Sequence, residues 1–152
     1  MWKIITLIIA GIVVLFAAIQ LVPYGRDHTN PAVQQEPNWD SPQTRQLAAA
    51  ACFDCHSNQT QWPWYSNIAP VSWLIQHDVE EGRRALNFSE WGNRHAEVDE
   101  IPEVIRRGAM PPSYYGLIHP PAQLTSTQKQ NLIQGTQATF GVASEGGEGE
   151  HD

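Results

Sequence analysis

The sequence predicts an all-α domain that follows an N-terminal transmembrane helix. An uncharged apolar run opens the chain from Ile4 to Val22. Beyond it, apolar residues recur at helical spacing in several segments, and no segment shows the alternation of a half-buried strand. The chain has 152 residues, of which 41% are hydrophobic. That length is enough for one compact domain with short appendages and excludes a large multidomain protein.

The apolar run has the length of a membrane span. As a helix, its nineteen residues would be about 28 Å long, close to the ~30 Å hydrocarbon core of a bilayer. Trp2 and Tyr24 would lie at the two interfaces. A signal peptide is the alternative, but no small-x-small cleavage pattern follows the run. We expect a single-pass anchor in the cytoplasmic membrane, with the remaining chain on the periplasmic, extracytoplasmic side, because the positive amino terminus favours the inside.

Composition divides the chain into four parts. Residues 1–23 form the membrane anchor or signal peptide, and residues 24–38, which include Pro31 and Pro37, form an extended tether. Residues 39–140 form the folded domain. Residues 141–152 form an acidic, glycine-rich tail that has too few apolar side chains to order itself, so we expect it to be disordered.

Four helices are predicted in the folded domain. The first begins at Ser41, whose hydroxyl caps a helix with Pro42 in its first turn, and it continues through an alanine run into the segment 52–56. The second extends from about Pro70 to Leu86. Its apolar residues recur at helical spacing and predict the buried face: Val71, Leu74, Ile75 and Val79.

The third and fourth predicted helices lie in the C-terminal half. The third covers 98–107 and has Ile101, Val104 and Ile105 on one face. The fourth begins at Thr125 or Ser126, where Gln128 completes a capping box with Thr125. Its buried residues are predicted to be Leu132, Ile133 and Phe140.

The element that carries chemistry is the pattern C-x-x-C-H, formed by Cys52, Cys55 and His56. This spacing is typical of c-type haem attachment. On a helical turn the two thiols would face the same way and could bond to the two vinyl groups of the porphyrin, while the adjacent imidazole reaches the iron. We therefore expect one covalently bound haem c, with His56 as an iron ligand.

The motif allows three other interpretations. A redox dithiol would normally follow a strand in an α/β fold, and no strand is predicted before Cys52. A structural zinc site needs four ligands, and the chain offers no second Cys or His pair at matching spacing. A membrane-anchored structural module without a cofactor would require the pattern to be accidental.

The sixth iron ligand is predicted to be Met110, the sole methionine besides Met1. Gly108 precedes it and Pro111 and Pro112 follow it, so its loop is rigid enough to hold a thioether against iron. The competing ligands are histidines of the folded domain: His77, His95 and His119.

Aromatic residues follow the motif at unusual density. Trp62, Trp64 and Tyr65 are predicted to wall the haem, and their N–H and O–H groups either donate to its propionates or only pack. Tyr114 and Tyr115 follow the methionine loop, and their hydroxyls likewise either donate to the propionates or only pack.

Two long segments resemble a known family. The stretch NWDSPQTRQLAAAACFDCHSNQTQWPWYSNIAPVSWLIQHDVEEGRRALNFSEW, from Asn38 to Trp91, and AMPPSYYGLIHP, from Ala109 to Pro120, are similar to the bacterial haem-binding domain family, itself similar to class I cytochromes c. The resemblance implies a cytochrome c-like, mostly helical, single-haem, membrane-tethered domain. It also implies thioether attachment at Cys52 and Cys55 and proximal ligation by His56.

The function expected from these features is one-electron transfer between redox partner proteins, among them respiratory membrane complexes, and not enzymatic catalysis. The net charge of −7, without a basic patch, argues against nucleic acid as a partner. Residues 23–140 hold eight basic and twelve acidic groups, so a basic docking site on the partner is expected. The alternative is a haem peroxidase or a gas or redox sensor, which needs an open or displaceable sixth position.

Overall fold

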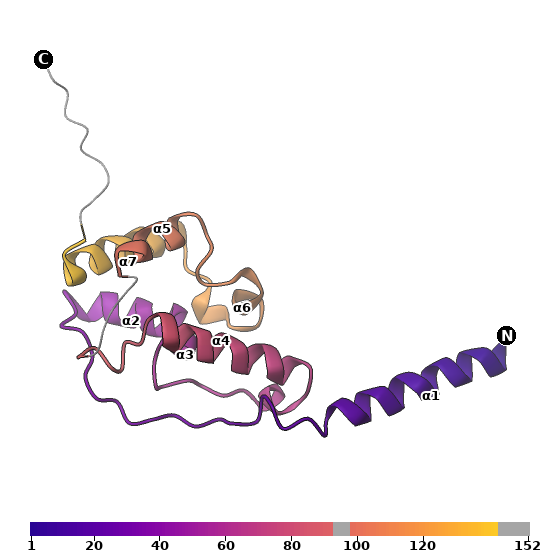
Figure 1. Cartoon of the computed structure of the whole chain (residues 1–152). Helices are drawn as coiled ribbons and strands as arrows, with labels where there is room; N and C mark the ends of the chain where they lie inside the picture. The colour runs from indigo at the N-terminus through magenta and orange to yellow at the C-terminus, as the bar shows by residue number, and fades with distance from the viewer. Residues whose placement is uncertain (93–97, 143–152) are drawn as a thin grey trace, which may run out of the picture.

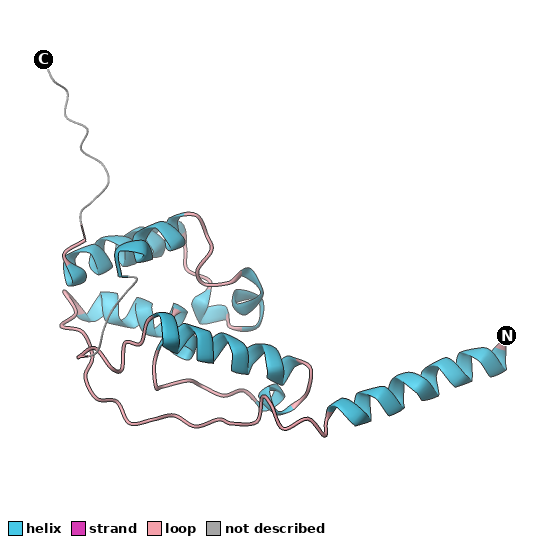
Figure 2. Cartoon of the chain, in the orientation of Figure 1, coloured by secondary structure: helices cyan, strands magenta, loops and turns pink. Residues whose placement is uncertain are grey.

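The computed structural model describes residues 1–92 and 98–142, and every regular element in these residues is helical (Figures 1 and 2). The prediction of an all-α domain is therefore confirmed. Within the described residues, the one β-type pairing is an isolated bridge between Gln35 and Glu90. The elements are α1 (Trp2–Ile19), α2 (Pro42–Ala51), α3 (Phe53–His56), η1 (Trp64–Asn67), α4 (Val71–Ala85), η2 (Val98–Glu100), α5 (Ile101–Arg106), α6 (Ser113–Ile118), η3 (Pro120–Ala122) and α7 (Ser126–Phe140).

Helix α1 extends away from the rest of the molecule, and none of its residues is buried (Figure 1). Its 18 residues are long and apolar enough to cross a membrane, a test that a signal sequence near the N-terminus also passes. At about 1.5 Å per residue it is roughly 27 Å long, close to the predicted span. An apolar helix that buries nothing against its own domain needs another apolar environment.

The segment 24–38 is extended, as predicted, but it lies along the domain and contacts it repeatedly. The His28 ring stacks on Trp62 with centroids 4.5 Å apart. The Asn30 side-chain amide donates to the Thr60 carbonyl at 2.9 Å, and the Gln34 backbone N–H donates to the Ser89 carbonyl at 2.8 Å. The segment is therefore a strap fixed to the domain surface.

The main core lies between α2, α3, α5 and α7. Its centre is aromatic: Trp39 and Phe88 have centroids 5.3 Å apart, and the Trp91 ring stacks on Phe140 at 4.8 Å. Gly135 of α7 packs so tightly on α2 that a β-carbon there would lie 2.0 Å from the Thr44 hydroxyl. The aliphatic members of the core include Leu47, Ala48, Leu86, Ile101, Ile105 and Leu132.

The predicted helix starts are confirmed. The Ser41 hydroxyl accepts from the Thr44 N–H, and Thr125 and Gln128 form the full capping box. Ile101 and Ile105 of the third predicted helix are buried, although its first turn is the 3-10 helix η2. The predicted tail falls largely on 143–152, outside the described residues.

The predicted buried face of α4 is only partly right. Val79 is buried and Ile75 is half-buried, but Val71 and Leu74 are exposed, and Ser72, Gln76 and Gly82 are buried instead. The reason is close packing. The face of α4 that contains Gly82 lies against α3, and a side chain larger than that of glycine would not fit at Gly82. Apolar side chains at the start of α4 are left on the surface as a result.

Candidate functional site

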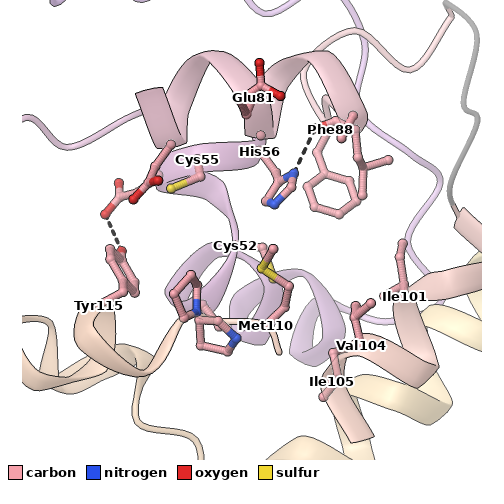
Figure 3. Close-up of a pocket in the computed structure, with 18 of the residues that line it drawn as sticks. Cys52, Cys55, His56, Glu81, Phe88, Ile101, Val104, Ile105, Met110 and Tyr115 are labelled. Atoms are coloured by element: carbon pink, nitrogen blue, oxygen red, sulfur yellow. Dashed lines mark hydrogen bonds between the residues drawn. The ribbon is translucent and has the colours of Figure 1, made fainter. Parts of the chain in front are cut away.

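A cavity of about 430 Å³ lies between α3 and α4 on one side and α5 and α6 on the other (Figure 3). This volume is typical of pockets that enclose a cofactor or a small ligand. Cys52, Cys55, His56 and Met110 all line it. Apolar side chains make most of the remaining wall: Leu86, Phe88, Ile101, Val104 and Ile105.

The sequence predicts one continuous helix through the C-x-x-C-H motif, but the structure has a break in it. Helix α2 ends at Ala51 and α3 begins at Phe53, and Cys52 between them has the non-helical angles φ −128° and ψ −34°. The His56 N–H donates to the Cys52 carbonyl at 2.8 Å, so the motif still closes on itself. Both thiols are free, and Figure 3 shows them on separate parts of the cavity wall.

Gly82 sets the distance between α4 and the motif. A β-carbon at this position would lie 2.4 Å from the Cys55 carbonyl oxygen and 2.8 Å from its carbonyl carbon. Such distances are far below van der Waals contact, so only glycine allows α4 to pass this close. The glycine thereby fixes the backbone that carries Cys55 and His56.

His56 is oriented by the chain that follows α4. Its Nδ1 lies 3.1 Å from the Leu86 carbonyl oxygen, and because a carbonyl only accepts, Nδ1 carries the proton (Figure 3). That tautomer places the ring's lone pair on Nε2, the form in which an imidazole binds a metal ion. The Phe88 N–H in turn donates to the His56 carbonyl at 2.8 Å.

The two thiols favour the protonated form, unlike those of a redox dithiol. Burial raises the pKa of Cys52 to about 12, and burial followed by the nearby Asp78 and Asp54 raises that of Cys55 to about 12. Reactive dithiols have lowered pKa values and a strand before them, and here α2 precedes the motif. Over the described ranges 1–92 and 98–142, no group of three or more His, Cys, Asp or Glu could hold a metal ion.

Met110 lines the cavity from the loop between α5 and α6 (Figure 3). Its loop is fixed by its own backbone, because the N–H groups of Ala109 and Met110 both donate to the Val104 carbonyl, at 2.9 and 3.1 Å. Gly108 has φ +73°, which reverses the chain after α5 and favours glycine. The predicted rigidity of this loop has this structural basis.

Two tyrosines close the methionine side of the cavity. The Tyr114 hydroxyl donates to Asp78 of α4 at 2.8 Å, and the Tyr115 hydroxyl donates to Asp54 of α3. These bonds join α6, which directly follows the methionine loop, to the two elements that carry the motif. Both tyrosines line the cavity, and in this structure their hydroxyls donate to carboxylates of the protein.

The cavity rim is acidic. Among the described residues, the carboxylates that line it are Asp54, Asp78, Glu81 and Glu100, and the basic groups besides the motif histidine are Arg84 and His77. Glu81 and Arg84 form an ion pair one helical turn apart. The rim therefore has a negative potential toward an approaching molecule.

The predicted aromatic wall is not at this cavity. Trp62 stacks on the strap, Trp64 is 77% exposed, and the Tyr65 hydroxyl lies 3.5 Å from His119 Nε2, so none of the three lines the cavity. Of the competing ligands, His77 lines it and His119 does not, while His95 lies outside the described residues. Phe88 is the aromatic wall residue that sequence analysis missed, because nothing in its local sequence shows that it packs against the motif.

A helical domain whose cavity gathers two thiols, an imidazole and a thioether has the groups that hold a haem. The sequence pattern of the haem-binding domain family matches residues 14–138, and the chain belongs to this family. The resemblance found from the sequence is thus confirmed, and the chain is a haem protein. No curated protein and no solved structure matches it.

Proposed function

We propose that this protein is a membrane-anchored, single-haem electron carrier. In this proposal the haem is bonded to Cys52 and Cys55, and its iron is ligated by His56 and Met110. The observation that supports it most directly is that one cavity of about 430 Å³ is lined by all four of these residues, which come from both of its sides.

The donor set fits a haem that cycles between two oxidation states. A bound haem supplies a reversible one-electron change at its iron, and a His/Met pair favours the ferrous state and raises the reduction potential. The Leu86 carbonyl orients His56, and the Val104 carbonyl holds the backbone at Met110. The apolar wall around Phe88 and Ile101 excludes water, which also tunes the potential.

The acidic rim supports a basic redox partner. Electrostatic complementarity speeds the encounter of two proteins and fixes their relative orientation. An electron carrier needs a brief, oriented encounter rather than a tight complex, and charges at the rim of the pocket provide it. No side chain of the protein has to transform a substrate in this proposal.

The proposed location is the extracytoplasmic face of the cytoplasmic membrane. Helix α1 is long and apolar enough to cross a bilayer, and the family match begins at residue 14, inside α1. The matched region therefore includes the last turns of α1 and the strap that follows. A tethered carrier would stay close to respiratory complexes in the same membrane.

The decisive experiment compares Met110→Ala with the parent protein, both matured in a cell that attaches haem c. We expect the parent to be six-coordinate and low-spin, with the ferric sulfur-to-iron band, and Met110→Ala to lose that band and bind carbon monoxide readily. His119→Ala is the matched control, since His119 is outside the cavity. An identical spectrum in Met110→Ala would exclude methionine ligation, and peptide mass without an added porphyrin at residues 52–56 would exclude covalent attachment.

A haem peroxidase or sensor remains the second candidate, because His77 and Arg84 line the same cavity and Met110 is 38% exposed. A polar group on the distal side and a displaceable ligand are what such proteins require. This candidate predicts a five-coordinate, high-spin parent or one that takes up carbon monoxide without any substitution. It further predicts that His77→Ala, and not His119→Ala, changes the reactivity.

A further inference from the structure

One end of the domain carries a surface of exposed apolar side chains, which we term the apolar end. They come from η1, the start of α4 and the end of α6. Trp64 and Leu117 are each 77% exposed, and large apolar side chains gathered at one end of a domain are typical of an interaction surface. The members of the apolar end are Trp64, Ile68, Val71, Leu74, Leu117 and Ile118.

Three of these side chains share one site on the surface. Val71, Leu74 and Ile118 line a single shallow cavity of about 70 Å³ between α4 and α6. The Tyr65 hydroxyl and His119 Nε2, 3.5 Å apart, join η1 to the residue that follows α6. Three elements distant in the sequence thus contribute to the same face.

The segments that supply the apolar end contain no charged residues. No Asp, Glu, Lys or Arg occurs from residue 55 to 77, and none from residue 108 to 128. The charged groups beside the apolar end are Asp54 and Asp78, which line the shallow cavity between α4 and α6. Apolar side chains leave water at low cost, whereas charged ones do not.

The end of α1 is fixed directly onto this surface. The Gln20 side chain, one residue after α1, donates to the Ala69 carbonyl at 2.9 Å and accepts from the Ala69 N–H at 3.0 Å. Gly25, at φ +84°, packs so closely that a β-carbon would lie 2.6 Å from the Ser72 carbonyl carbon. The Tyr24 hydroxyl donates to Glu80 of α4 at 3.1 Å. The anchor therefore leaves the domain beside Ile68 and Val71.

Helix α1 leaves the domain on the same side as the apolar end. In Figure 1, α1 extends from the side of the domain where α6 and the N-terminal end of α4 lie, while the C-terminal end of α7 is at the opposite side. A bilayer around α1 would meet the side from which the helix leaves. That side carries the apolar end.

We propose that the apolar end rests in the headgroup region of the same bilayer that α1 spans, and that the contacts of residues 20–25 with α4 hold it there. The inference rests on the proposed membrane anchor. Indole rings prefer this interface, and exposed apolar side chains gain by entering it. A protein partner is the competing occupant, but the surface adjoins the end of the membrane helix and its exposed side chains come from uncharged segments, which favours lipid.

This orientation would place the haem cavity close to the membrane. Asp54, Cys55, Asp78 and both tyrosines of α6 line the main cavity as well as the shallow one beneath the apolar end. The redox site would then face partners embedded in the same bilayer, at a constant height, rather than swing on a flexible linker.

The test uses the full-length haem-loaded chain in nanodiscs of phosphatidylethanolamine and phosphatidylglycerol. A photo-crosslinking benzoylphenylalanine replaces Trp64 or Leu117, and the control replaces Ala138, an exposed residue near the C-terminal end of α7. We expect lipid adducts at least tenfold more abundant at 64 and 117 than at 138. Equal yields, or adducts to a membrane protein instead of lipid when native membranes are used, would overturn the proposal.

Two further measurements separate the possible failures. Alkaline washing of proteoliposomes reports whether α1 anchors the chain in the membrane. Release of the protein would refute the membrane anchor. Retention of the protein together with equal adduct yields would refute only the contact of the apolar end with lipid. Gly25→Ala should lower the adduct yield at Leu117 several-fold, whereas Gly141→Ala, which also has a positive φ but open space around it, should not. An unchanged yield in Gly25→Ala would overturn the role of the exit contacts.

Discussion

Replacing Gly82 by alanine tests whether the closeness of α4 to the motif positions the haem ligands. The added β-carbon would lie 2.4 Å from the Cys55 carbonyl oxygen, where ordinary contacts begin at 3.4 Å, so α4 and α3 would have to separate by about 1 Å. The atoms that clash are backbone, which cannot rotate away as a side chain could. Overpacking of this kind costs about 1–3 kcal/mol.

The helix itself would gain from the same substitution, because alanine is favoured over glycine in a helix interior by about 1 kcal/mol. Since the clash is with backbone, we take the upper part of the overpacking range and expect a net loss of about 2 kcal/mol. For a domain of this size that corresponds to a fall of roughly 10 °C in the apparent Tm. Displacement of Cys55 and His56 should also reduce the fraction of chains that acquire haem.

The assay compares thermal unfolding, followed by the absorbance of the haem, with the haem content per chain after maturation. Gly116→Ala is the matched control, because its β-carbon would meet only the flexible Gln123 side chain at 3.4 Å. We expect Gly116→Ala to keep its haem content and its Tm or to gain slightly. A Gly82→Ala protein with full haem content and an unchanged Tm would refute the argument that this glycine spaces the motif.

Two other predictions concern titration and docking. Burial and the hydrogen bond to Asp78 raise the pKa of Tyr114 to about 12, so the unfolded chain loses this proton near pH 10 while the folded chain keeps it. The contribution of Tyr114 to the free energy of unfolding is therefore fully present below pH 10 and is lost between about pH 10 and 12. Urea unfolding at pH 8 and 11 measures this loss, and we expect Tyr114→Phe to reduce it. An identical loss of stability in the variant would contradict the assignment. Electron transfer to a cationic redox protein should slow as salt rises, and Glu100→Gln should weaken the salt dependence while Glu103→Gln, outside the cavity, should not. Rates independent of salt in the parent would remove the docking role of the rim.

Local chemistry made several features predictable from the sequence. Caps act within one helical turn, so Ser41 and Thr125 marked helix starts that the structure confirms. The C-x-x-C-H spacing is equally local, and it led to Cys52, Cys55 and His56 in the cavity. Met110 was found because it is the one internal methionine and its flanking Gly and Pro residues restrict the loop.

Predictions that depended on which surface a segment faces were less successful. Apolar spacing on α4 predicted that Val71 and Leu74 are buried, yet the tertiary contact at Gly82 rotates these residues to the surface. The density of aromatic residues at 62–65 predicted a haem wall, but Trp62 stacks on the strap, the Tyr65 hydroxyl lies next to His119, and Trp64 is exposed. Neither outcome is encoded within the segment itself, because both depend on contacts with other parts of the chain.

The sequence by itself determined the helical class, the apolar first helix, the motif and the family, because each depends on spacing or composition within a short stretch. Only the tertiary structure decided that the Leu86 carbonyl orients His56, that Gly82 sets the distance between α4 and the motif, and that the end of α1 is hydrogen-bonded to the domain beside exposed apolar side chains. The physical reason is that close packing and hydrogen-bond geometry depend on how distant segments meet, and single side chains of ordinary type give no local sign of that meeting.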